Sequence, residues 1–244
     1  MMWRDSLRGL LYVAWKDMRA YYFKPPNISW GMLFPGVLIL AFAVRTPGDL
    51  QSLVPGLVAM TALFSATSME AIVITFERRT GALDRLLLAP MTLPALLAGK
   101  VMGGMLFGLT ISVVVLLGAA VAFGLVIWRL PIALLGLIVS TAAFSALGAL
   151  VSVMVDEVFE AQTLANAIRF PMIFVGGVFV PLEQLPGVLP RVARLLPLTY
   201  AVEALDVALL GGSVPQMGLD LGVLLAFTGA LFAAATAILR RRLD

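Results

Sequence analysis

The sequence contains no cysteine and no histidine. Disulfides, thiolate chemistry, the usual zinc sites and histidine-dependent catalytic triads are therefore excluded. The phosphate-binding pattern G-x-x-x-x-G-K-[ST] is also missing, because Pro94 and Val101 stand where Gly99-Lys100 would need a glycine and a hydroxyl residue. We expect no cofactor and no metal in this chain, and any ATP that it depends on must bind elsewhere.

Charged residues are scarce, at 13% of the 244 residues, against about 25% in soluble domains. Apolar residues make up 61%, and the mean hydropathy is +1.02. The chain holds six apolar runs of the length that a membrane helix needs, about 20 residues. They cover 28–44, 53–76, 95–127, 131–155, 161–180 and 219–239. The sequence therefore predicts an all-α integral membrane protein with six transmembrane helices, forming a single domain over 1–244.

The basic residues favour one orientation of these helices. Twelve of the sixteen Lys and Arg residues other than Arg169 fall on the side that holds both chain ends. Because Lys and Arg are enriched in cytoplasmic loops, we expect both termini in the cytoplasm. The same placement explains the isoelectric point of about 9.6 without a nucleic-acid partner. The third run exceeds one membrane thickness, so we expect its first turns in the cytoplasmic interface, with Lys100 snorkelling.

Residues 1–26 are predicted to form an interfacial helix. Leu10, Ala14 and other apolar residues recur at helical spacing, opposite Arg8, Lys16 and Arg19. Such a helix suits the lipid headgroup zone. The alternative is a solvated amphipathic helix that packs on another subunit.

The segment 77–94 is predicted to form a short cytoplasmic amphipathic helix. Leu83, Leu86 and Leu87 share one face, Asp84 lies off it, and Pro90 ends the helix. The leucines could enter a groove on a soluble partner or rest on the lipid surface, and the residues favour neither.

The segment 181–212 carries four prolines, at 181, 186, 190 and 197, yet it is too apolar for an ordinary exposed loop. We expect a re-entrant helical hairpin that dips into the outer leaflet; a simple extracellular hairpin is the alternative. Thr199 is predicted to cap its second helix, with Glu203 in the first turn and Gly211-Gly212 at the end.

Three polar residues fall inside predicted spans. Arg169 and Glu70 are expected at similar depth, roughly 13 and 10 Å from the cytoplasmic side, and Asn166 lies one turn before Arg169. The two charges could form a pair. Alternatively, Arg169 snorkels to the headgroups while Glu70 is protonated or faces a water-filled cavity.

Two segments together resemble the signatures of the type-2 ABC exporter permeases, which move drugs, lipids and polysaccharides. The first, 77–100, has Glu-Arg, Gly81 and the spaced leucines ahead of Gly99-Lys100; the second reads GVFVPLEQLP at 177–186 and PLTYAVEAL at 197–205. The six-span layout is similar along the whole chain. Two positions depart from the family pattern, Ala82 where Thr is frequent and Asp206 where Arg is frequent.

The resemblance implies that the loop between spans two and three is a coupling helix that contacts an ATPase, and that spans one and five line a dimer interface. The residues so assigned to ATPase coupling are Glu77, Arg78, Gly81, Leu83, Asp84, Leu86, Leu87 and Pro90. Those assigned to the outer re-entrant segment are Pro181, Glu183, Pro186, Pro197, Thr199, Tyr200 and Glu203.

The function that the resemblance implies is the permease subunit of an ATP-driven exporter in the plasma or inner membrane. It implies two permeases, identical or different, with two cytoplasmic ABC ATPases that hold ATP and Mg. The apolar walls favour an amphipathic drug, lipid or lipid-linked substrate, and the chain itself is not an enzyme. Two other classes remain open on the residues alone, a secondary transporter or channel and a membrane-embedded enzyme.

Overall fold

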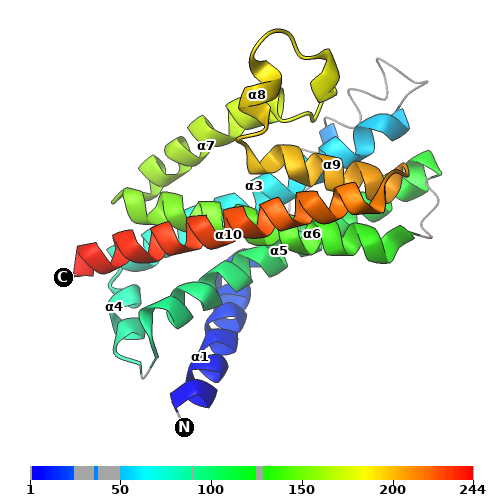
Figure 1. Ribbon diagram of the computed structural model, residues 1–244. Helices are drawn as coiled ribbons and strands as arrows, with labels where there is room; N and C mark the ends of the chain where they lie inside the picture. The colour runs from blue at the N-terminus through cyan, green and yellow to red at the C-terminus, as the bar shows by residue number, and fades with distance from the viewer. Residues whose placement is uncertain (1, 25–35, 38–49, 90, 125–128, 244) are drawn as a thin grey trace.

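The computed structural model describes residues 2–24, 36–37, 50–89, 91–124 and 129–243, and these residues form helices and no strands (Figure 1). The predicted all-α class is confirmed for this part of the chain, whereas the predicted first span, 28–44, lies almost wholly outside it. In chain order the elements are α1 (Met2–Asp17), η1 (Met18–Tyr22), α3 (Leu50–Arg79), α4 (Ala82–Leu87), α5 (Leu93–Phe123), α6 (Leu130–Met154), α7 (Val158–Val175), η3 (Leu182–Gln184), α8 (Leu189–Ala193), α9 (Pro197–Leu209) and α10 (Val214–Leu243).

Four of the described helices are long and apolar enough to cross a membrane, namely α3, α5, α6 and α10. They coincide with the second, third, fourth and sixth predicted spans, which confirms those four. Helix α7 covers the fifth predicted span but is not among the four. It has only 18 residues and carries Glu160, Asn166 and Arg169. The count of six spans therefore stays a prediction.

Helix α3 lies at the centre of the bundle and packs against α5, α6, α7 and α9. Small residues bring the neighbours close: a Cβ on Gly108 of α5 would lie 2.7 Å from the Ala66 Cβ, and one on Gly148 of α6 would lie 2.5 Å from the Thr67 carbonyl oxygen. Helix α10 packs on α6 and α9. Its Leu219 and Leu225 remain exposed, as suits a helix that faces lipid.

One end of the bundle is tied together by ion pairs, and we call it the α4 end. Arg78, in the last turn of α3, lies 3.1 Å from the Asp156 carboxylate in the turn between α6 and α7. Arg242, near the end of α10, pairs with the same carboxylate and donates to the Met154 carbonyl oxygen at 2.9 Å. Figure 1 shows α4 and the end of α10 at this end of the molecule.

The segment 181–212 folds into η3, α8 and α9, and two expectations about α9 are wrong. Leu196, not Thr199, precedes the first turn, because Pro197 occupies the first helical position, where its missing N–H and fixed φ are suited. Thr199 instead donates its hydroxyl to the Ala193 carbonyl oxygen at 2.7 Å. Glu203 therefore falls in the second turn, where it accepts from Arg194 at 2.6 Å.

The predicted end of α9 is confirmed. The helix ends at Leu209, and Gly211 follows with φ of +99°, a conformation that glycine adopts without strain. The re-entrant position of the hairpin relative to a membrane stays a prediction.

Candidate functional site

The predicted amphipathic helix at 77–94 is shorter than expected. Helix α3 continues through Arg79, so Glu77 and Arg78 belong to its last turn. Gly81 then adopts φ of +68°, which turns the chain into the six-residue α4. The Thr92 hydroxyl accepts from the Ala95 amide at 3.4 Å and caps α5. Pro90 lies outside the described residues.

Leu83 does not lie on a face that a partner could reach, so this part of the prediction is wrong. Its side chain is 1% exposed, because α4 packs on both α3 and α5 and uses its apolar face within the chain. Asp84 and Arg85 are exposed, and Leu86 and Leu87 are half-buried. The most exposed apolar side chain here is Leu88, at 86%. The exposed side chains of α4 and of the residue that follows it are therefore Asp84, Arg85 and Leu88.

Beneath this surface lies a group of four charged side chains that we call the charge cluster: Lys16, Asp17, Glu77 and Lys100. Lys100 pairs with Glu77 and lies 2.8 Å from an Asp17 carboxylate oxygen, and all three side chains are fully buried. Lys16 lies 2.8 Å from Asp17 and 2.5 Å from Glu77. The expectation that Lys100 snorkels is wrong, because two carboxylates bind its ammonium inside the protein.

The charge cluster is balanced, with two ammonium groups against two carboxylates. Burial alone would lower the pKa of Lys16, but the carboxylates of Asp17 and Glu77 outweigh that effect and raise it. Both oxygens of Glu77 accept from lysines. Glu77 is therefore not free to contact a second protein. It joins the end of α3 to α1 and α5.

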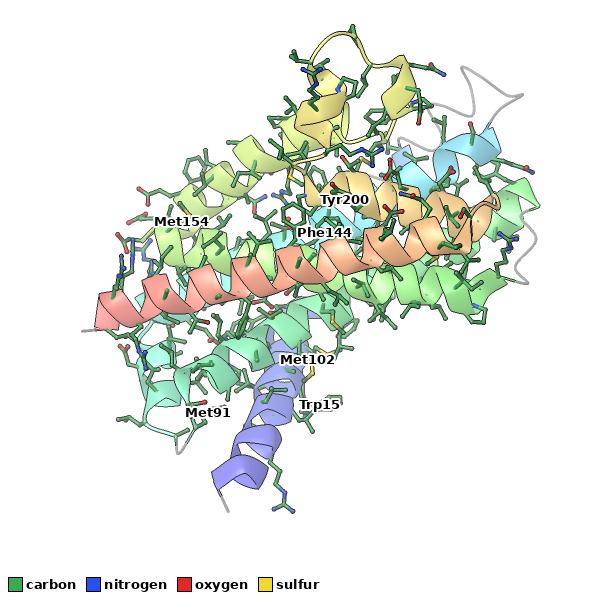
Figure 2. The ribbon with its side chains drawn as sticks, in the orientation of Figure 1. Trp15, Met91, Met102, Phe144, Met154 and Tyr200 are labelled. Atoms are coloured by element: carbon green, nitrogen blue, oxygen red, sulfur yellow. The ribbon has the colours of Figure 1, made fainter. Side chains whose placement is uncertain are left out.

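Helix α1 lies directly on α5, because glycines leave room for it. A Cβ on Gly99 would lie 2.8 Å from the Leu10 carbonyl oxygen, and one on Gly103 would lie 3.1 Å from the Tyr22 ring. The other side of α1 exposes Leu11, Tyr12 and Trp15, the last of which Figure 2 labels. The exposed side suits a lipid interface, which stays a prediction.

Tyr22, in η1, extends the contact of the N-terminal segment into the core. Its hydroxyl donates to Glu70 at 2.5 Å, and both side chains are fully buried. Gly104 and Gly148 make room for the Glu70 side chain, since a Cβ at either position would come within 2.9 Å of it. Glu70 therefore faces α5, α6 and the N-terminal segment.

Arg169 has other partners, and the predicted pairing with Glu70 is wrong. Its guanidinium donates to the Phe64 carbonyl oxygen at 3.2 Å and to the Ser68 hydroxyl. It also donates to Asn166 at 2.6 Å. Residues two apart do not share a helix face, so Ser68 and Glu70 point away from each other on α3. Arg169 is fully buried, which contradicts snorkelling as well.

Asp17 and the buried contacts of Lys16 and Lys100 were not predicted from the sequence. A signal was present for Lys100, because a lysine within the otherwise apolar α5 is costly unless it is paired. The spacing along the chain could not identify the partners, since Asp17 and Lys100 are 83 residues apart.

Comparison with known proteins supplies a family. The family model for "ABC-2 type transporter" matches residues 8–210. Nodulation protein J of Rhizobium leguminosarum bv. trifolii is 30% identical over 259 residues, covering 99% of this chain and 92% of that protein. Nodulation protein J of Rhizobium meliloti (strain 1021) is 29% identical over 253 residues, covering 99% of this chain and 92% of that protein. The inner membrane transport permease YadH of Escherichia coli (strain K12) is 24% identical over 192 residues, covering 79% of this chain and 75% of YadH.

Proposed function

The chain belongs to the ABC-2 type transporter family, and on that premise we propose that it is the membrane permease of an exporter driven by a separate ABC ATPase. Membership implies an ATPase partner in general, and the four long apolar helices support a multi-pass membrane protein. The α4 end is proposed to face the cytoplasm, where the ATPase binds ATP and Mg. The assembly is proposed to contain two permeases and two ATPases.

The proposed coupling route begins at the exposed residues of α4. Asp84, Arg85 and Leu88 would contact the ATPase, and ATP binding or hydrolysis would displace α4. Only Thr80 and Gly81 separate α4 from the last turn of α3, and α3 would follow the displacement through this short connection. Glu77 in that last turn would pass it on through Lys16 and Lys100 to α1 and α5. The observation that carries this route is the buried charge cluster.

The proposed substrate is an amphipathic drug, lipid or lipid-linked molecule that moves out of the cytoplasm or the inner leaflet. The exposed faces of α5 and α10 are apolar, with Val114, Val121 and Leu225 among their exposed side chains. Such faces suit a molecule that reaches the protein through lipid.

The test is copurification of an untagged ABC ATPase from the same genome with the tagged chain. Leu88→Asp should remove most of the ATPase, because a carboxylate buried without a partner costs on the order of a few kcal/mol. Leu195→Asp is the matched control, since Leu195 is 73% exposed on the segment between α8 and α9, and it should retain the ATPase. Amounts are compared at equal membrane insertion.

Two results would contradict the proposal. The first is equal ATPase recovery with wild type and Leu88→Asp. The second is full transport by the purified chain alone, independent of ATP, which would favour a secondary transporter or channel.

A further inference from the structure

Helix α10 has the features of a helix that faces lipid along most of its length. Figure 1 shows it across one outer face of the bundle. The most apolar stretch of α10 is 11% buried, whereas that of α3 is 83% buried. Leu219, Ala226, Ala233 and Arg240 follow one another at seven-residue spacing and are all exposed, so they share one face of the helix. The apolar exposed face of α10 therefore continues into Arg240.

The length of this face matches the thickness of a bilayer. Leu219 and Arg240 are 21 residues apart in the sequence. This separation is about 32 Å along a helix, against a hydrocarbon core of about 30 Å. When Leu219 lies at one edge of the core, Arg240 therefore reaches the headgroups at the other edge. Arg241 follows directly and is also exposed.

Positive charge is in excess where α10 ends. The acids at this end are already bound by arginines that lie beside it. Arg78 and Arg242 contact the same oxygen of Asp156, its Oδ1, which brings the ends of α3 and α10 together. Arg79 pairs with Glu157 at 3.2 Å. No acid of this group is therefore left to neutralise further arginines.

Arg240 and Arg241 are the further arginines. Among the residues that the structure describes, neither forms an ion pair. With their neighbours they make up a cluster of five: Arg78, Arg79, Arg240, Arg241 and Arg242. Clusters of four or more basic residues beside a membrane helix attract anionic headgroups, by a factor of about five per residue.

We propose that Arg240 and Arg241 bind the phosphate of an anionic phospholipid, whose acyl chains lie against the exposed face of α10. A guanidinium suits a phosphate because its N–H groups form a fork that can bind two oxygens at once. A lipid fits this place better than a soluble protein, because the same face is apolar over the thickness of a bilayer. The inference goes beyond the proposed function and needs no ATPase.

The test measures the binding of fluorescent lipids to the purified full chain in dodecyl maltoside, by fluorescence anisotropy. The probes are NBD-labelled phosphatidylglycerol and NBD-labelled phosphatidylcholine with the same acyl chains. We expect wild type to bind the phosphatidylglycerol probe about tenfold or more tightly. Arg240→Gln combined with Arg241→Gln should reduce this preference about fivefold or more. Arg240→Lys combined with Arg241→Lys should keep most of it, because the charge remains.

Arg85→Gln combined with Arg191→Gln is the matched control, because it removes the same amount of charge. Both arginines are exposed, Arg85 on α4 and Arg191 on α8, and neither lies on α10. The control should retain the preference. An equal loss in the control would overturn the proposal, because the lipid would then respond to net charge alone.

Two further results would overturn the proposal. One is equal affinity of wild type for the two probes, which would leave Arg240 and Arg241 a role in orientation alone. The other is an unchanged preference in the double glutamine variant, whose folding is checked by its affinity for the phosphatidylcholine probe. Glycerol 1-phosphate carries the phosphate without acyl chains and should not displace the probe in large excess. Displacement would assign the arginines to a soluble anion instead.

The outcome is separable from ATPase assembly. The double glutamine variant of Arg240 and Arg241 should copurify the ATPase as wild type does. Loss of the ATPase from this variant, with the lipid preference unchanged, would overturn the proposal and assign the arginines to a protein contact. Failure of wild type to copurify an ATPase, with the lipid preference intact, would refute only the proposed function.

Discussion

Two groups of buried charged side chains in the described part of the chain have partners within it. Lys100 lies between Asp17 and Glu77, and the Arg169 guanidinium is bound by Phe64, Ser68 and Asn166. Each match offsets a desolvation cost of several kcal/mol per ion. Removing one partner therefore strands the other, whereas removing both restores the balance. The difference between single and double substitutions therefore measures the energy of each contact separately.

We expect Glu77→Gln to lower the free energy of unfolding by about 3–5 kcal/mol, because Lys16 and Lys100 then share a single carboxylate. Glu77→Gln combined with Lys100→Met should cost less than the sum of the two single changes. The measurement is denaturation of the purified chain in detergent. Arg85→Gln serves as the control, because Arg85 is exposed on α4, and it should change stability by less than about 0.5 kcal/mol. Strictly additive costs would show that Glu77 and Lys100 do not interact.

Arg169 should couple energetically to Ser68 and not to Glu70. Ser68→Ala removes an acceptor of the guanidinium and should cost about 1–3 kcal/mol, but much less when Arg169 has already been changed to Gln. The effects of Glu70→Gln and Arg169→Gln should add, since Glu70 accepts from Tyr22 on the other side of α3. Two double-mutant cycles measured by thermal unfolding decide between these assignments. Coupling in the second cycle would restore the ion pair that the sequence suggested.

Helices α3, α5, α6 and α10 could be predicted to within a few residues, because a long apolar run has few alternatives in a membrane. The residues at which the helices begin and end were harder to predict. Helix α3 continues to Arg79 because Glu77 is buried by lysines from distant parts of the chain. The face of α1 was also misassigned, since Lys16 was predicted to lie on the outer polar side but turns toward Glu77. Periodicity shows which residues share a face; it does not show which helix that face will meet.

Close helix contacts can be tested with two glycines of α6. Gly148→Ala should destabilise the protein by about 1–3 kcal/mol, because the new Cβ would lie 2.5 Å from the backbone oxygen of Thr67. Gly136→Ala is the control: its Cβ would meet the Leu205 side chain at an ordinary 3.5 Å, and alanine favours a helix over glycine by about 1 kcal/mol. It should therefore be neutral or stabilising. Equal loss of thermal stability in both variants would show that the α3–α6 contact is looser than described.

The molecule as a whole has two chemically different ends. The α4 end holds the charge cluster and the pairs of Arg78 and Arg242 with Asp156. The other end holds the start of α10 and the short helices of the outer segment, where Arg194 pairs with Glu203 and Arg129 donates to the Val207 carbonyl oxygen of α9. Among the described residues, the α4 end combines an exposed surface with a buried link between α1, α3 and α5. This division supports the proposed ATPase contact at the α4 end.

The absence of cysteine makes the orientation of these ends directly measurable. A cysteine placed at Gln184, which is exposed in η3, should react in intact cells with a membrane-impermeant maleimide. A cysteine at Asp84, exposed in α4, should react only after the membrane is permeabilised. Leu205→Cys is the control for burial, since Leu205 is fully buried in α9, and it should react weakly under both conditions. Because one helix separates neighbouring loops by a full membrane thickness, the first two results must be opposite if the chain spans the bilayer as proposed. Reaction of Asp84→Cys in intact cells, with Gln184→Cys protected, would invert the topology and place α4 out of reach of any cytoplasmic ATPase.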